Sequence, residues 1–250
     1  MNIEGEYLKN QPLLKLLMST GFGSRRYIAN LIKQEKITIN GEKVVDFTFP
    51  VNVERDSIQI DNKPIVLKQK QKLVLMLNKP AGIISTTADE KGRKTVLDIL
   101  PAKYRNMMLY PVGRLDKNTT GLLLLSNDGE MTYHLTHPKF EHEKEYLVLI
   151  TRKLNVTELQ RIKNGVLLDD GITYPGKIKV YNAHRQPFVY SVTIHEGRKR
   201  QIHRMFEQFE RNIIALKRIR IGDIELGNLR EGEVRQLSKP EINRLFKNPK

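Results

Sequence analysis

Residues 113–130 read GRLDKNTTGLLLLSNDGE and place one carboxylate, that of Asp116, just ahead of four consecutive leucines. The leucines predict a buried strand, whereas the residues before them are typical of a polar loop. A charge at the end of an apolar strand must be solvated, paired or used in a reaction. Taken alone, the stretch favours an aspartate that pairs with Arg114 or caps backbone amides.

The composition restricts the class of protein. The chain has 250 residues, of which 39% are hydrophobic, and a mean hydropathy of -0.46. It has no apolar run near the 18 or more residues that a membrane span requires, and its first residues lack the apolar stretch of a secretion signal, so we expect a cytoplasmic protein without a membrane partner. The absence of cysteine excludes disulfides, iron–sulfur clusters and thiol catalysis, and makes zinc less favoured.

The charge of the chain indicates a polyanionic partner. Lys and Arg exceed Asp and Glu by 43 to 28, which gives a net charge of +15. The excess is clustered, because residues 198–220 contain eight basic and two acidic residues. Each Lys or Arg that neutralises a phosphate releases counterions, so the clustering favours nucleic acid over a surface that is merely basic.

The local patterns predict two domains. Residues 1–66 read as helix, helix and hairpin, with Ser24 as a helix cap and Asn40-Gly41 as a hairpin turn. The polar and basic segment 67–72 is the expected linker. Residues 73–250 form the second domain.

Strands and helices alternate irregularly in the second domain. Thr95 is expected to cap a short helix through Leu100, and residues 198–209 read as a basic amphipathic helix. Because no strict βαβ rhythm is present, we expect an α+β fold with a mixed, mostly antiparallel sheet flanked by helices.

Several kinds of site are disfavoured. No GxGxxG or P-loop motif is present, and no GxSxG motif supports a hydrolase triad. His134 and His137 form an HxxH pattern, but no third ligand stands at metal spacing, so two residues of a helix face are the better interpretation. The remaining histidines are scattered along the chain.

Five segments in order resemble one family, the pseudouridine synthases that act on ribosomal RNA. The stretch around Asp116 resembles their catalytic signature. The other four segments are LNKPAGIISTTADEKGRKTVLDILP, HPKFEHEKEYLV, EGRKRQIHRMF and LKRIRIGDIELGNLREGEVRQLS. Residues 13–60 also resemble the small RNA-binding domain, shared with ribosomal protein S four, that precedes the catalytic domain in one branch.

The resemblance implies roles for particular residues. Asp116 would be the nucleophile that breaks the glycosidic bond of uridine, and Tyr146 would stack on the uracil. Arg198 would form an ion pair with Asp116, and Arg114 would help to extrude the base. RNA contacts are expected from Arg25, Arg26, Lys199, Arg200 and Arg204. The family uses no cofactor and no metal.

The chemistry is reasonable for these residue types. A carboxylate can attack a sugar carbon, as in glycoside hydrolysis. A guanidinium nearby would keep Asp116 ionised in an apolar site, and a base that leaves its stack needs an aromatic platform. The chain departs from the wider family at Arg200, where histidine is usual, and at His203, where arginine or lysine is common.

We therefore expect a monomeric enzyme that converts uridine to pseudouridine in ribosomal RNA or a ribosomal assembly intermediate. The insertion at 89–101 and the spacing at 137–146 favour large-subunit RNA over small-subunit RNA. The alternatives are the same reaction on small-subunit RNA and a non-catalytic RNA-binding assembly factor. A glycosidase with paired carboxylates lacks a second acid near Asp116.

Overall fold

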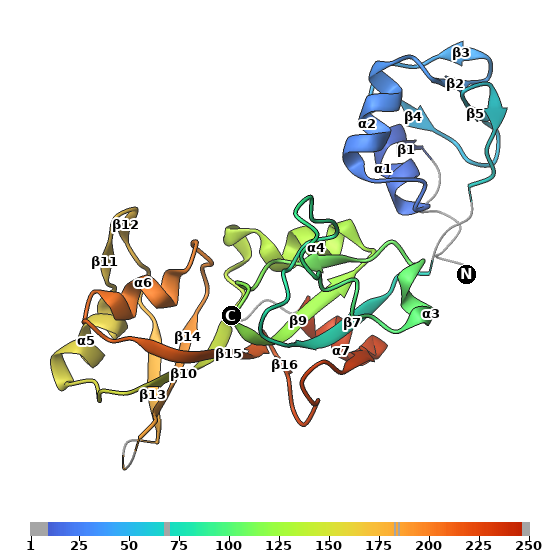
Figure 1. Ribbon diagram of the computed structural model, residues 1–250. Helices are drawn as coiled ribbons and strands as arrows, with labels where there is room; N and C mark the ends of the chain where they lie inside the picture. Colours follow the sequence, from blue (N-terminus) through green and yellow to red (C-terminus); the bar gives the residue numbers. More distant parts are fainter. Residues whose placement is uncertain (1–9, 68–70, 183, 185, 247–250) are drawn as a thin grey trace. The chain divides into compact units, whose positions relative to one another are not determined.

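The computed structural model describes residues 10–67, 71–182, 184 and 186–246. The chain divides into two compact units, residues 1–72 and 73–250 (Figure 1). No helix in these described ranges is long and apolar enough to cross a membrane.

The first unit combines two helices with short strands. Ser24 accepts a hydrogen bond from the Tyr27 amide and so caps the second helix, as the sequence predicted. Asn40 and Gly41 both have positive φ, which suits a tight hairpin turn. The helices and sheet share one apolar core. The elements are β1 (Gln11–Pro12), α1 (Leu13–Ser19), α2 (Arg25–Lys33), β2 (Ile37–Ile39), β3 (Glu42–Lys43), β4 (Pro50–Val51), β5 (Ile58–Ile60) and β6 (Lys63–Pro64).

The second unit is built on one mixed sheet with the strand order β13-β14-β10-β15-β9-β7-β17, to which β8 and β16 are added at β9 and β15. Its described strands also include the separate hairpin β11–β12. The strand bounds are β7 (Val74–Lys79), β8 (Tyr110–Val112), β9 (Thr120–Ser126), β10 (Lys144–Ile150), β11 (Leu167–Leu168), β12 (Gly171–Ile172), β13 (Lys177–Asn182), β14 (Phe188–Ile194), β15 (Ile213–Ile221), β16 (Ile224–Glu225) and β17 (Val234–Gln236).

One short parallel contact joins the two halves of this sheet. β9 and β15 run parallel over two residue pairs, Lys217 with Thr120 and Arg218 with Gly121, and the other pairings in the sheet are antiparallel. Gly121 has φ of +98°, and a Cβ atom there would lie 2.2 Å from the Arg218 carbonyl oxygen. Only glycine permits this close approach of the two backbones. The loop with Asp116 enters the sheet at this junction.

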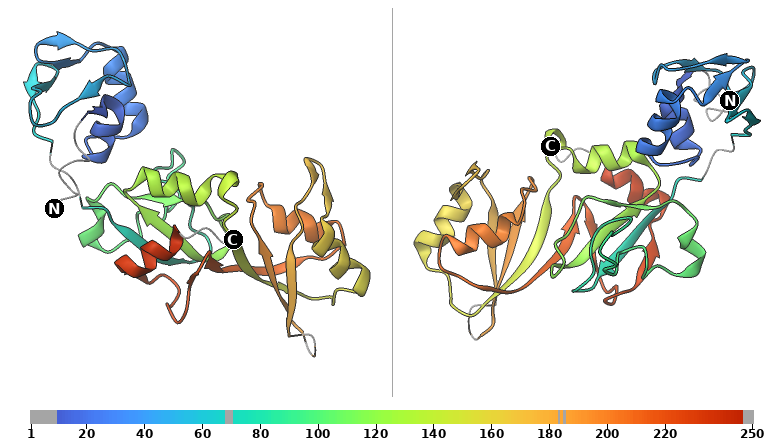
Figure 2. Two further views of the ribbon diagram at one scale, coloured as in Figure 1. Left: turned by 180° about the vertical axis from the view of Figure 1, so that it is seen from behind. Right: turned by 45° about the horizontal axis from the view of Figure 1, so that its top comes forward.

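Helices cover both faces of the sheet. α3, α5 and α6 contribute to one apolar cluster, and α4 and α7 contribute to the other. Figure 2 shows α5 and α6, in yellow and orange, beside β13 and β14 at one end of the sheet. The bounds are α3 (Ala102–Arg105), α4 (Gly129–Thr136), the 3-10 helix η2 (Pro138–Phe140), α5 (Val156–Asn164), α6 (Gln201–Glu207) and α7 (Lys239–Leu245).

Two helix predictions need correction. Residues 95–100 form turns rather than a helix, because the Asp98 carboxylate accepts hydrogen bonds from both the backbone N–H and the hydroxyl of Thr95. The predicted basic helix at 198–209 begins only at Gln201. Arg200 immediately before it has φ of 49°, in the left-handed region, and so stands outside the helix. The α+β class and the mixed, mostly antiparallel sheet are confirmed.

Candidate active site

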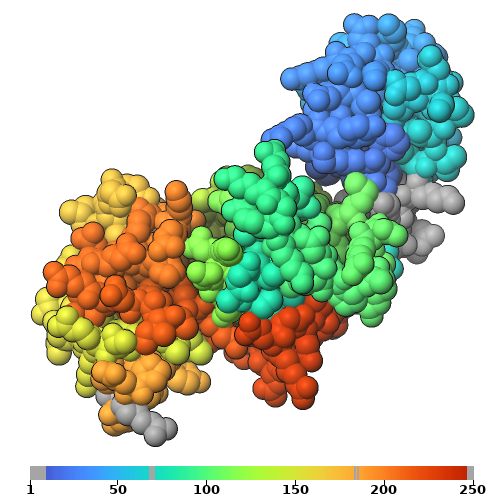
Figure 3. Space-filling view, in the orientation of Figure 1, coloured from blue at the N-terminus to red at the C-terminus, as the bar shows by residue number. Residues whose placement is uncertain are grey.

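A cleft of about 470 Å³ lies beside the loop that carries Asp116. The segments around it are the loop 116–119, the helix α6 with the turn before it, and the first half of β15 with the two residues before it. Figure 3 shows the orange segment that contains α6 bordering green segments of the same unit. The lining residues are Asp116, Lys117, Asn118, Thr119, Arg200, His203, Glu207, Arg211, Asn212, Ile213, Ile214, Ala215 and Leu216.

Lys79, the last residue of β7, forms hydrogen bonds with the backbone of the loop that carries Asp116. Its side chain is fully buried, and its Nζ donates hydrogen bonds to the carbonyl oxygens of Lys117 (3.0 Å), Thr119 (2.9 Å) and Pro80 (2.9 Å). Burial lowers the Lys79 pKa to about 8, although the negative charge of Asp116 acts in the opposite direction. Lys79 is not among the site residues predicted from the sequence, although a lysine at the end of an apolar strand is a visible signal.

Two further contacts fix the same loop. The Ser85 hydroxyl donates to the Leu115 carbonyl oxygen at 3.0 Å and accepts from the Leu115 amide at 3.2 Å. The Gly82 amide donates to the Lys117 carbonyl oxygen at 2.9 Å. The segment that follows β7 therefore holds the backbone on both sides of Asp116.

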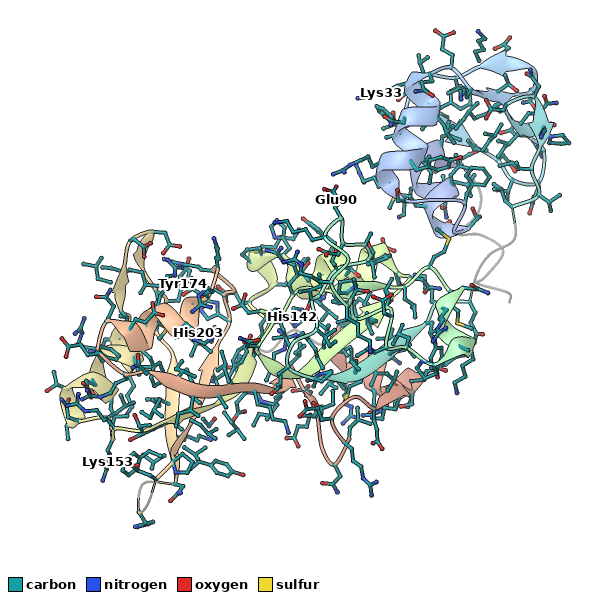
Figure 4. The ribbon with its side chains drawn as sticks, viewed as in Figure 1. Lys33, Glu90, His142, Lys153, Tyr174 and His203 are labelled. Atoms are coloured by element: carbon teal, nitrogen blue, oxygen red, sulfur yellow. The ribbon has the colours of Figure 1, made fainter. Side chains whose placement is uncertain are left out.

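The Asp116 side chain is exposed to the cleft. Among the described residues, none forms a hydrogen bond or an ion pair with its carboxylate. His203, labelled on α6 in Figure 4, also lines the cleft, and the negative charge of Asp116 acts to raise its pKa. Burial and the cation of Arg200 lower the pKa of His203 more than Asp116 raises it, so the imidazole is neutral near pH 7.

The expected ion pair between Arg198 and Asp116 is not formed. The Arg198 Nε donates to Glu196 at 2.8 Å, and its two Nη atoms donate to the carbonyl oxygens of Gly171 (2.9 Å) and Ile172 (2.7 Å). This prediction was wrong because the guanidinium is already occupied by the β11–β12 hairpin. Arg198 therefore anchors that hairpin to the segment before α6.

Tyr146 lies on β10 opposite Arg218 of β15. Its side chain is 8% exposed, and its hydroxyl oxygen is 3.5 Å from Nη1 of Arg218. The Arg218 Cζ atom is 6.0 Å from the centre of the tyrosine ring, within the range of a cation–π contact. Arg218 is a second residue of this region that was not predicted from the sequence.

The side chains that we expect to contact RNA differ in their exposure and in the ion pairs that they already form. Arg114, Arg25, Arg26 and Lys199 have exposed side chains. Arg200 is also exposed and lines the cleft, 3.6 Å from Glu207. Arg204 is not available in this structure, because its guanidinium forms ion pairs with Asp169 and Asp170 at 3.0 and 2.9 Å.

The HxxH pattern does not form a metal site. In the described part of the chain, no group of three or more His, Asp or Glu residues is arranged to hold a metal ion. His134 instead lies with its Nδ1 at 3.1 Å from Nε2 of His142, which is buried.

Comparison with known proteins gives consistent matches. The family model described as RNA pseudouridylate synthase matches residues 73–208. A large-subunit pseudouridine synthase B of Bacillus subtilis is 37% identical over 94% of this chain and 95% of its own length. An uncharacterised RNA pseudouridine synthase of Aquifex aeolicus is 37% identical over 93% of this chain and 92% of its own length.

A solved structure supports the same assignment. A crystal structure of a pseudouridylate synthase aligns with a TM-score of 0.66 and 30% identity, and the alignment covers 93% of this chain and 98% of that one. Sequence and fold therefore agree over nearly the full length of both proteins. This chain belongs to the RNA pseudouridylate synthase family.

Proposed function

We propose that this protein isomerises uridine to pseudouridine in large-subunit ribosomal RNA and that Asp116 is its nucleophile. The observation that carries the proposal is the open carboxylate of Asp116, which faces a cleft from a loop held by Lys79. A nucleophile must be free to reach the substrate while its backbone stays fixed. Asp116 meets both requirements.

The reaction changes the connectivity of the nucleoside but not its composition. A carboxylate oxygen of Asp116 attacks C1′ of the ribose, and the electrons of the C1′–N1 bond leave with N1 as a uracil anion. The uracil turns and C5 forms a bond to C1′, which releases the carboxylate. C5 then loses its proton and N1 gains one.

Several residues prepare the substrate for this step. A uridine inside a helix cannot reach Asp116, so the nucleotide must be flipped out of its stack. Arg114 is exposed two residues before Asp116 and would occupy the space that the base leaves. Tyr146 would be the uracil platform, with about 1–3 kcal/mol of stacking if it behaves as other base–aromatic contacts do.

The substrate assignment rests on the relatives and on charge. The related Bacillus subtilis protein is named for the large ribosomal subunit. Arg25 and Arg26, exposed at the start of α2, would bind phosphates of the same RNA. A ribosomal substrate, whether free RNA or an assembly intermediate, places the enzyme in the cytoplasm, where we expect it to act as a monomer.

The test compares wild-type protein with Asp116→Asn on transcripts of large-subunit and small-subunit RNA. Release of tritium from [5-³H]uridine measures turnover, and filter binding measures affinity. We expect turnover on large-subunit RNA only, its loss in the Asn variant, and RNA affinity within about threefold of wild type, because one carboxylate contributes little to phosphate binding. Asp223→Asn, at an exposed turn, is the charge-matched control.

The same assay separates the alternatives. A non-catalytic assembly factor would bind RNA without releasing tritium in the wild-type protein. Turnover restricted to small-subunit RNA would keep the chemistry and refute the substrate. Turnover retained in Asp116→Asn would refute the role of Asp116.

A further inference from the structure

Arg218 is a buried cation that pairs with no carboxylate in the part of the chain that the structure describes. Its side chain is 3% exposed, and among the described residues no Asp or Glu lies within ion-pair distance of it. Its Nε donates to the Leu122 carbonyl oxygen at 2.7 Å, and its Nη2 has no hydrogen-bond partner in the described structure. An uncompensated buried charge costs several kcal/mol (about 3–5 when a partner has been removed), so its retention calls for a reason.

The strand geometry places Arg218 next to the cleft. Leu216 lines the cleft, and Arg218 is two residues further on, on the same face of β15. The two residues stand opposite Val148 and Tyr146 of β10. Arg218 therefore lies beyond the lining residue Leu216, on the side of the cleft toward Tyr146.

A β-bulge lies between the pairs that Arg218 and Arg220 form with β10. The register of β10 and β15 shifts between Glu145 and Tyr146, so Tyr146 pairs with Arg218 while Glu145 pairs with Arg220. Arg220 is fully engaged, because it forms ion pairs with Glu145 at 2.8 Å and with Glu143 at 3.1 Å. Beyond the bulge Arg220 therefore takes both carboxylates, and no Asp or Glu of the described ranges pairs with Arg218.

Two other polar groups lie near Arg218 or in the cleft: the ammonium of Lys144 and the hydroxyl of Thr119. Lys144 lies two residues before Tyr146, and its Nζ donates to the carbonyl oxygens of His142 (3.0 Å) and His195 (3.2 Å). Burial and the charge of Arg218 lower the Lys144 pKa to about 8, so Lys144 is still mainly protonated at pH 7. Thr119, which lines the cleft beside Asp116, has a buried hydroxyl that forms no hydrogen bond with any of the described residues.

We propose that the Arg218 guanidinium binds a carbonyl oxygen of the flipped uracil through Nη2 and stabilises the negative charge that develops when the bond from C1′ to N1 breaks. This inference rests on the proposed function, which generates a uracil anion whose charge spreads over N1, O2 and O4. A fixed cation in a water-poor site stabilises such a charge without reorganisation. The cost of burying Arg218 is thereby offset only during the reaction.

The test pairs two variants on one strand. Arg218→Met removes the charge but keeps a long apolar side chain, and Arg220→Met is the matched control. We expect Arg218→Met to lower kcat about 10²- to 10³-fold, with KM for RNA changed less than about threefold. Its melting temperature should be unchanged or higher, because replacing a buried charge by an apolar group is often stabilising. Arg220→Met should show the reverse, a lower melting temperature with kcat retained.

Arg218→Lys supplies the conservative variant. It keeps a cation beside Tyr146 but loses the planar guanidinium, so its kcat should fall less than that of Arg218→Met. A kcat within threefold of wild type in Arg218→Met, or a loss in Arg218→Lys as large as in Arg218→Met, would overturn the inference. Failure of both variants to fold would assign Arg218 a structural role and overturn it too. If wild-type protein itself produces no pseudouridine, the proposed function fails before Arg218 is tested.

Discussion

Replacing Lys79 by Met should separate the Asp116 loop from the sheet that supports it. The change removes three hydrogen bonds from a fully buried ammonium. Hydrogen bonds to a charged group contribute about 1.5–3 kcal/mol each, but desolvation of the ammonium offsets part of that sum. We expect a net loss of about 2–4 kcal/mol, which lowers the melting temperature by about 5–10 °C for a unit of this size.

We also expect Lys79→Met to lose activity under conditions in which it remains folded. A displacement of a reactive group by about 1 Å can cost 10²-fold in rate, so we expect kcat of Lys79→Met to drop about 100-fold at a temperature where the variant is folded. Tritium release measures kcat, and thermal melting followed by circular dichroism measures stability. Lys153→Met, at an exposed position, is the control. If turnover and melting temperature both equal those of wild type, Lys79 does not hold the Asp116 loop in place.

The pH dependence provides an independent check of Lys79. The pKa of this lysine falls from 10.5 to about 8 on folding. Between these values the unfolded chain holds a proton that the folded protein has released, so this residue makes stability rise with pH in that window. Lys144 has a similar pKa, so the difference between wild type and Lys79→Met isolates the contribution of Lys79. A pH-independent difference would contradict the assignment.

Three further predictions concern other parts of the chain. Gly121→Ala should lower the free energy of unfolding by about 3–5 kcal/mol in urea denaturation, because its Cβ would meet the Arg218 backbone; a loss below about 1 kcal/mol would show that the backbones can separate. His142 has a pKa of about 4, lowered first by burial, so stability should decrease as the pH falls from 6.5 to 4, and His142→Gln should flatten that curve in acid melting experiments. Replacing Arg25 and Arg26 by Ala should weaken RNA binding and reduce the slope of log K against log salt concentration by about one unit for each lost phosphate contact. An unchanged slope would show that these two residues of α2 do not contact RNA phosphates.

Local patterns predicted most of the elements and the loop of Asp116. The Ser24 cap, the Asn40-Gly41 hairpin and the leucine strand depend on neighbours in sequence, and each lies where the pattern indicated. The helix predicted from Thr95 failed because Thr95 and Asp98 close a turn just as well as they cap a helix. Short polar motifs do not distinguish these two outcomes.

Contacts between residues far apart in the chain could not be predicted from the sequence. Arg198 was assigned to Asp116, but its hydrogen-bond acceptors Asp170, in the turn before β12, and Gly171 and Ile172 of β12 lie 26 to 28 residues away in the chain. A β-bulge after Arg218 sets which residues of β15 pair with Tyr146 and Glu145. Register shifts of this kind are fixed by packing across the sheet and leave little trace in a single sequence.

The most direct measurement is a map of pseudouridines across ribosomal RNA from cells that lack this gene, complemented with wild-type protein or with Asp116→Asn. We predict that one or a few large-subunit positions lose pseudouridine in the deletion, that wild-type protein restores them, and that the Asn variant does not. Restoration by Asp116→Asn, or an unchanged map in the deletion, would contradict the role of Asp116 or the assigned substrate.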